Sequence, residues 1–404
     1  MSDTQSLQAE SSTSSTSASH RPRAYWSGVF AMTLCVFTLI ASEFMPVSLL
    51  TAISSDLGVS TGLVGQGIAI SGAFAVITSL SISTIAAKRD RKHLLLGLTA
   101  LMLISGAIIA EASGYLMYMV GRSLIGVSIG GFWALSAACA MRLVPKNQVP
   151  KALAIFNGGN ALAMILAAPL GSYLGSIVGW RGAFWCLVPL SLFALVWQYI
   201  SLPAMKSEQQ GGGVGRLWSL IKNPVIGIGM AAVGLFFMGQ FTLYTYIRPF
   251  LETVTQIDAT LISLSLLIVG IAGFVGTALI GRFLNKSLYG TLIMIPLLMA
   301  VIGMSMMLLG HSFSAVAVAL ACWGLLATAA PVGWWTWVAR IMPDDSEAGG
   351  GMMVAVIQLT IALGSTLGGI LYDFSGHELT FSVAAIIMVL ASGAAYLSSR
   401  GHSE

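Results

Sequence analysis

The chain has 404 residues, of which 56% are hydrophobic and 8% are charged, with a formal net charge of +4. A single water-soluble core of this size cannot bury so much apolar surface, so the composition excludes a soluble protein and indicates one that spans a membrane. The positive charge is confined to particular gaps between apolar stretches. We therefore attribute it to membrane orientation and expect a lipid bilayer, and no nucleic acid, as partner.

The chain divides into five parts in order. Residues 1–24 are rich in Ser, Thr and Gln and predict a disordered cytoplasmic tail, with no cleaved signal peptide. Six apolar stretches follow over 25–202, each of about 20 residues, the length that a hydrocarbon layer of ~30 Å requires. Residues 203–223 contain three consecutive glycines and predict a flexible cytoplasmic linker. Six further stretches occupy 224–398, and residues 399–404 form a second cytoplasmic tail.

Lysine and arginine fall in alternate gaps between these stretches. Sixteen of the nineteen lie in the tails, the linker or every second loop, whereas the intervening loops carry one cation, Arg181. By the positive-inside rule, this pattern places both termini in the cytoplasm and predicts an even number of crossings, which we count as twelve.

The two sets of six stretches resemble each other at an offset of about 200 residues. Asp56 and Asp258 are 202 positions apart, and so are Gly131 and Gly333. Two six-helix bundles related by a pseudo-repeat are typical of secondary transporters that alternate access to a central site. We therefore predict an all-α membrane protein with two pseudo-symmetric bundles.

Two glycine-containing motifs carry a family resemblance. Gly121-Arg122 with Gly126, Gly130 and Gly131 resembles an R-x-x-x-G signature, and Ala168-Pro169-Leu170-Gly171-Ser172 looks like a proline-glycine antiporter motif. The chain is thereby identified as a member of the major facilitator superfamily, among its twelve-helix drug:proton antiporter-like exporters. The strings Glu43-Phe44-Met45-Pro46 and Thr245-Tyr246-Ile247-Arg248-Pro249 are similar to those of purine ribonucleoside efflux pumps and, less closely, of sugar exporters. The resemblance implies that Pro169 and Gly171 form a bend that seals the pathway against proton leak, although close helix packing explains them almost as well.

The loop after the second stretch departs from the family pattern. Ala87 stands where the family has an aspartate, which leaves Asp90 as the one acidic candidate for a cytoplasmic charge latch, beside Arg91. The sequence places these two residues among the candidates for conformational control.

Three ionisable side chains fall inside apolar stretches: Glu43, Arg122 and Arg248. A charge in the layer costs at least about 2.5 kcal/mol on insertion scales, so each requires a partner or a function. Glu43 is the one carboxylate at depth and is the candidate proton carrier. We expect Arg122, at a similar depth, to exchange between Glu43 and the backbone carbonyls that Pro46 leaves without a donor. A permanently paired carboxylate and static helix anchors remain the alternatives for these three residues.

Pro249 is expected to bend the seventh stretch as Pro46 bends the first. Taking the two prolines as equivalent places Tyr246 at the position that matches Glu43, which gives the two halves unlike chemistry at like positions. Kinks that serve only packing are the alternative.

Substrate contacts are expected from aromatic and amide side chains of the central helices. Flat rings suit a nucleobase, and amides suit the hydrogen-bonding groups at its edge. The candidates, any of which could instead serve packing or lie at the membrane interface, are Phe132, Trp133, Gln240, Tyr244, Tyr246, Arg248, Trp334, Trp335 and Gln358.

Together these features predict a monomeric proton-coupled antiporter of the bacterial inner membrane that exports purine ribonucleosides such as inosine and guanosine, or their analogues. Exporters of sugars or lipophilic drugs are the alternative, and a membrane sensor is a more remote one. The apolar stretches contain no nucleophile with a base and no paired metal ligands, so we expect neither an enzyme nor a metal site. We expect no cofactor, with the proton gradient as the driving force.

Overall fold

The computed structural model describes residues 24–86, 89–145, 148–205, 222–342 and 346–400. The predicted tails therefore lie outside the described residues except at Ala24 and at 399–400. Residues 206–221 of the predicted linker, and Ala87, also lie outside the described residues.

The described chain is helical and contains no strand. Its first five helices are α1 (Trp26–Leu57), α2 (Thr61–Ala86), α3 (Arg91–Ala110), α4 (Tyr115–Arg142) and α5 (Val149–Ser201). The remaining six are α7 (Pro224–Tyr244), α8 (Ile247–Thr253), α9 (Ala259–Lys286), α10 (Leu288–Leu309), α11 (Phe313–Ile341) and α12 (Ser346–Arg400).

Two of these helices are each a pair of crossings joined at a glycine. A straight helix of the 53 residues of α5 would be about 80 Å long, more than twice the hydrocarbon thickness. The chain turns at Gly179 (φ 75°, ψ 167°) in α5 and at Gly376 (φ 69°, ψ −154°) in α12, conformations that favour glycine. The described residues form ten candidate membrane spans, with α7 and α8 counted as one. Dividing α5 and α12 at their glycines gives the twelve crossings predicted from the sequence.

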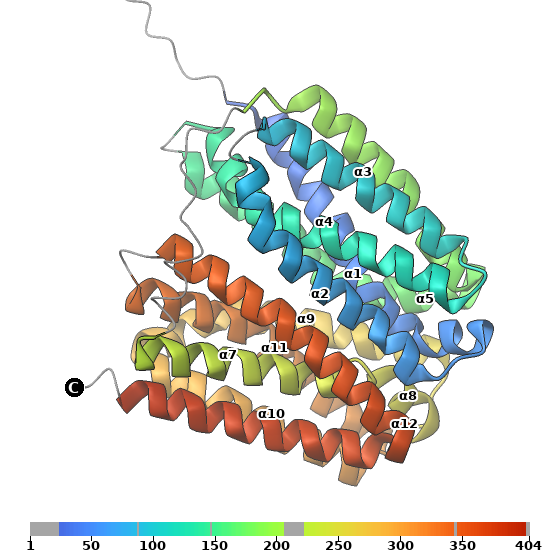
Figure 1. Ribbon diagram of the computed structural model, residues 1–404. Coiled ribbons are helices and arrows are strands. Elements are labelled where there is room, and N and C mark those ends of the chain that lie inside the picture. The colour runs from blue at the N-terminus through green and yellow to red at the C-terminus, as the bar shows by residue number, and fades with distance from the viewer. Residues whose placement is uncertain (1–23, 87–88, 146–147, 206–221, 343–345, 401–404) are drawn as a thin grey trace, which may run out of the picture.

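The helices form two bundles, α1–α5 and α7–α12, which Figure 1 shows one above the other. The same pairings recur in both: α1 packs on α5 as α7 packs on α12, and α2 packs on α4 as α9 packs on α11. Glycines permit the close approaches, since a β-carbon at Gly130 would overlap the carbonyl of Ala75, and one at Gly276 would overlap that of Leu325. We call residues 24–205 the N half and residues 222–400 the C half.

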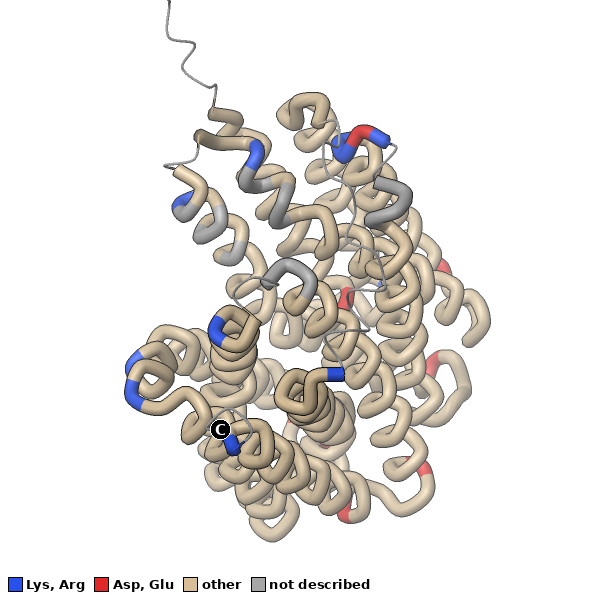
Figure 2. The backbone as a smooth tube through the Cα atoms, turned by 60° about the vertical axis from the view of Figure 1, so that its left-hand side comes forward, with Lys and Arg blue, Asp and Glu red and all other residues tan. Residues whose placement is uncertain are grey.

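The two ends of the bundles differ in charge. Figure 2 shows lysine and arginine gathered at the end where the C-terminus lies, while most aspartates and glutamates lie at the other end. We call these the basic end and the acidic end.

Most hydrogen bonds described between the two halves lie at the acidic end. They join the residues Ser48, Thr51, Ser60, Thr61, Gly62, Gly65 and Ser172 to Arg248, Glu252, Ser365 and Asp373. The halves are therefore joined at the acidic end in this conformation.

Candidate functional site

Arg122 lies in the interior of the N half, where it joins three helices. Its side chain on α4 is fully buried and donates from Nε to the carbonyl of Gly67 on α2 (3.0 Å). It also donates from Nη1 to the carbonyl of Ser42 (3.0 Å) and from Nη2 to that of Glu43 (3.3 Å), both on α1. Ser42 is the residue whose carbonyl loses its helical donor at Pro46, because proline has no N–H. The proline thus creates an acceptor that the buried guanidinium uses.

Glu43 lies beside this arginine and faces the C half. The residue is 6% exposed, and its carboxylate interacts with the side chains of Arg122 and Gln358. The ion pairs of the described residues include Arg181 with Asp56 and Arg248 with Glu252, but none joins Glu43 to Arg122. Gln358 belongs to α12, so the buried acid lies where the two halves meet.

Phe44, the residue after Glu43 on α1, contacts α7 of the C half. The rings of Phe44 and Phe241 are 5.9 Å apart and cross the boundary between the halves. Glu43 and Gln240 directly precede these two rings in the sequence. The helix breaks between α7 and α8 at Thr245 and Tyr246, ahead of Pro249.

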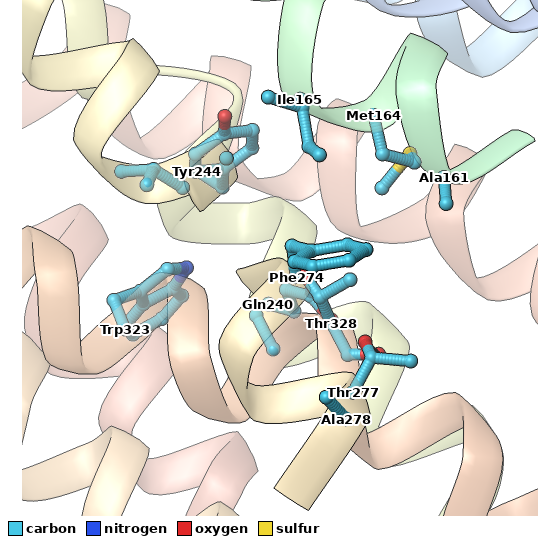
Figure 3. Close-up of a pocket in the computed structure, with 13 residues that line it drawn as sticks. Ala161, Met164, Ile165, Gln240, Tyr244, Phe274, Thr277, Ala278, Trp323 and Thr328 are labelled. Carbon is cyan, nitrogen blue, oxygen red and sulfur yellow. Dashed lines mark hydrogen bonds between the residues drawn. The ribbon is translucent and has the colours of Figure 1, made fainter. Parts of the chain in front are cut away.

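A cavity of about 200 Å³ opens near Gln240, between α5 of the N half and α7, α9 and α11 of the C half. Figure 3 shows Met164 and Ile165 of α5 on one side, the ring of Phe274 in the middle, and Tyr244, Gln240 and Trp323 on the C-half side. The full lining is Ala161, Met164, Ile165, Gln240, Tyr244, Val269, Gly270, Phe274, Thr277, Ala278, Trp323, Ala327 and Thr328. Aromatic faces with few polar groups are typical of a small-molecule site.

Three buried polar atoms in this region have no hydrogen-bond partner: Oε1 of Gln240, Oε1 of Gln358 and Nε1 of Trp323. Buried polar atoms are almost always paired, so unpaired ones at a cavity indicate that a ligand or water supplies the partner. Gln240 and Trp323 line the cavity, whereas Gln358 lies beside Glu43.

Arg248 on α8 holds the acidic end closed. Its guanidinium donates to the carbonyl of Ser48, to the hydroxyls of Thr51 (3.1 Å) and Ser172 (3.2 Å), and to the carboxylate of Glu252 (2.7 Å). Thr51 in turn donates to Glu252 (3.0 Å). Arg248 thus lies in a polar network between the halves and outside the cavity.

Tyr246 belongs to the same closed end. Its hydroxyl donates to the carbonyl of Ser365 (2.9 Å), and its ring stacks on Tyr372 at 5.4 Å. Asp373, one residue further on, accepts from the backbone N–H of Gly62 at the start of α2 (3.0 Å) and from the hydroxyl of Ser60. Together with the Arg248 network, these contacts close the acidic end.

The remaining aromatic candidates lie away from the cavity. Phe132 is buried in the core of the N half, and Trp133 packs edge-on against Phe156 beside it. Trp334 is buried in the core of the C half, and Trp335 is exposed on α11 beside Gly350. This conformation brings Gln240 and Tyr244 together at the cavity and leaves these four outside it.

Four of the conformational candidates, Pro169, Gly171, Asp90 and Arg91, pack within the N half. Pro169 lies inside α5, and a β-carbon at Gly171 would collide with Ser48 and Met45 of α1, so this glycine brings the two helices together. Asp90 caps α3 by accepting from the N–H of Lys92 (2.8 Å) and also accepts from the N–H of Met205 (2.9 Å). Arg91 is buried there, and its backbone N–H donates to the carbonyl of Met205 (3.0 Å).

Comparison with known proteins agrees with this architecture. The family model described as Major Facilitator Superfamily matches residues 32–357. The chain belongs to the major facilitator superfamily. As a member, it is a multi-pass membrane transporter.

Two relatives and one solved structure give the range of similarity. The chain is 57% identical over 378 residues to the transcription regulatory protein OpdE of Pseudomonas aeruginosa, covering 93% of this chain and 94% of the relative. It is 37% identical over 370 residues to the purine ribonucleoside efflux pump NepI of Salmonella enteritidis, covering 92% and 93%. The fold matches the crystal structure of a D-xylose-proton symporter with a TM-score of 0.74 at 16% identity, covering 93% of this chain and 98% of the other.

Proposed function

We propose that this transporter exports purine ribonucleosides, such as inosine and guanosine or their analogues, in exchange for protons by alternating access. The basic end faces the cytoplasm in this proposal, with both termini there, and the monomer works in the bacterial inner membrane without a cofactor. The observation that carries the proposal is the carboxylate of Glu43, which is buried where the halves meet, between Arg122 of the N half and Gln358 of the C half.

Glu43 serves as the proton carrier. In the state open to the periplasm it takes a proton, which removes its charge and its attraction for Arg122. The arginine then bonds the carbonyls of Ser42 and Glu43, as in the conformation described above. The halves rock to the state that is closed at the acidic end, and substrate entering from the cytoplasm binds as the proton leaves.

The purine assignment rests on the chemistry of the cavity and on the 37% identity to a protein named a purine ribonucleoside efflux pump. The cavity volume of about 200 Å³ lies below the roughly 300–1,000 Å³ of sites for drug-sized ligands. Aromatic side chains beside an amide suit a flat polar base better than a lipophilic drug. A sugar, the other alternative, would use hydroxyl partners more than ring faces.

Everted membrane vesicles provide the test. With an acidic lumen, the native protein should accumulate labelled inosine and guanosine, but neither arabinose nor a lipophilic cation. Glu43→Gln should abolish accumulation against a gradient and keep downhill exchange, because the amide cannot release a proton. Glu111→Gln is the matched control, since this carboxylate lies at the acidic end and accepts a hydrogen bond from Trp185. Uphill inosine transport by Glu43→Gln with an unchanged pH dependence would refute the coupling.

A sensing role is the second candidate, favoured by the name of the 57% identical relative, a transcription regulatory protein. A sensor would bind its ligand without net translocation. Purified protein that binds inosine but catalyses no flux in proteoliposomes would favour this candidate over transport.

A further inference from the structure

The cavity between the halves contains two unsatisfied polar atoms of opposite kind. Gln240 on α7 is 8% exposed and Trp323 on α11 is 1% exposed, and neither the amide oxygen nor the indole N–H has a partner. Figure 3 shows the indole nitrogen directed toward the part of the cavity where Gln240 and Phe274 lie. Both residues line the cavity, so this site contains one unpaired acceptor and one unpaired donor.

The other polar groups of the lining leave these two atoms available. The hydroxyl of Thr277 donates to the carbonyl of Gly273 (2.9 Å) within its own helix and lies near the carbonyl of Thr328 (3.3 Å). The amide oxygen of Gln240 can only accept, and the indole N–H of Trp323 can only donate. A ligand that satisfies both atoms therefore carries an N–H donor and an acceptor.

A lactam edge has this arrangement, with a ring N–H beside a carbonyl. Resting on the proposed function, we propose that Gln240 and Trp323 read the lactam edge of a 6-oxopurine. The N1–H donates to Oε1 of Gln240, and O6 accepts from Nε1 of Trp323.

The same geometry connects recognition with movement. Both reading residues belong to the C half, whereas Met164 and Ile165 on the opposite wall belong to the N half. A base held by its edge in the C half and covered by α5 contacts both halves at once. Binding energy is then available to favour one arrangement of the halves over the other.

Paired ligand analogues and variants test the two contacts separately in everted vesicles. 1-Methylinosine lacks the N1 donor, and 6-thioinosine keeps that donor but has sulfur, a weak acceptor, in place of O6. The native protein should transport each analogue about tenfold less efficiently than inosine, because each leaves one buried group unpaired. Gln240→Ala, which also leaves room for the methyl group, should bring the inosine to 1-methylinosine ratio close to one. Trp323→Phe should do the same for the 6-thioinosine ratio.

Ratios measured within one variant are independent of how much folded protein the membrane holds. Gln240→Ser replaces Gln240→Ala if the latter fails to insert. The matched controls are Gln198→Ala, a buried amide in the N half, and Trp334→Phe, a buried tryptophan of α11 outside the cavity, both of which should keep the native ratios.

The outcomes separate this inference from the proposed function. Transport of inosine with ratios that persist in the Gln240 and Trp323 variants overturns the edge assignment and leaves nucleoside export standing. Absence of nucleoside transport by the native protein overturns both. Collapse of each ratio in its own variant, and in no control, supports the assignment.

Discussion

Replacing Arg248 with methionine should open the acidic end. The side chain crosses from the C half to the N half and donates to the carbonyl of Ser48 and to the hydroxyls of Thr51 and Ser172. Methionine keeps much of the length and apolar volume but cannot donate. The variant therefore removes polar contacts between the halves and leaves the apolar packing around them largely in place.

The size of the effect follows from these bonds. A hydrogen bond to a charged group contributes about 1.5–3 kcal/mol net, and the bonds of one guanidinium are not additive. Taking the lower value for the whole set gives about 1.5 kcal/mol, which corresponds to about a tenfold shift toward the state open at the acidic end. Glu252 also loses its arginine, which favours opening further because the carboxylate is better hydrated in the open state.

Cysteine labelling measures this shift. Ser365 is fully buried at the closed end, with its hydroxyl 3.4 Å from the carbonyl of Gly65 in the other half. A Ser365→Cys reporter, in a chain whose four native cysteines are replaced by alanine, should react with a membrane-impermeant thiol reagent about tenfold faster when Arg248→Met is present. The rate follows the open population when opening and closing are faster than labelling.

Arg181→Met is the matched control. Arg181 also lies at the acidic end, but its bonds to Asp56 and to the carbonyl of Ala112 stay within the N half. Its loss should leave the labelling rate of Ser365→Cys unchanged. Equal acceleration by both variants, or none by Arg248→Met, would refute the view that Arg248 holds the halves together.

Three further predictions concern folding and the buried arginine. Gly130→Leu should prevent stable insertion because the new side chain would overlap the Ala75 carbonyl. Gly97→Leu, the control, has open space around it and should insert normally. The amount of protein in the membrane and its size-exclusion profile measure the difference. Gly179→Ala should lower the Tm by several degrees, because φ 75° with ψ 167° strains any residue that has a β-carbon by about 1–3 kcal/mol. Gly393→Ala, the control, has no close neighbour and should leave the Tm unchanged. Equal Tm values for the two variants would contradict the strain at Gly179. Arg122→Lys should abolish uphill inosine transport, since an ammonium cannot span the three carbonyls that the guanidinium bonds, and activity above half of native would contradict that role.

Some of this site could be predicted from the sequence because charge in an apolar stretch is conspicuous. Glu43 and Arg122 stand out against their surroundings, and Pro46 identifies the carbonyl that needs a donor. The amides Gln240 and Gln358 stand out in the same way. These predictions depend on residue type alone, and a membrane helix offers few polar residues to choose among.

The direction in which apolar residues face was harder to predict. In a soluble helix an apolar stripe marks the buried face, but here lipid and protein are both apolar and no such stripe exists. Trp323 therefore could not be separated from Trp334 by composition, although both lie in the core of the C half and Trp323 alone of the two lines the cavity. The break at Thr245 and Tyr246 lies where Pro249, which has no N–H, leaves the carbonyl of Thr245 without a helical donor.

The distribution of packing between and within the halves bears on the proposed rocking motion. A large apolar cluster lies within the N half, from Val29 on α1 to Leu202, and another fills the C half, with Val47, Ile68 and Ala168 as its members from the N half. Most of the described hydrogen bonds between the halves lie at one end. Moving the halves as rigid bodies exposes little of either core, whereas bending one half would disrupt close-packed interiors that tolerate little deformation. The polar contacts between the halves at the acidic end exchange readily for water. The motion of lowest free-energy cost therefore separates the halves at that end. In the proposed cycle, the proton on Glu43 and the base in the cavity both act at this boundary, where small binding energies have the largest effect on the equilibrium.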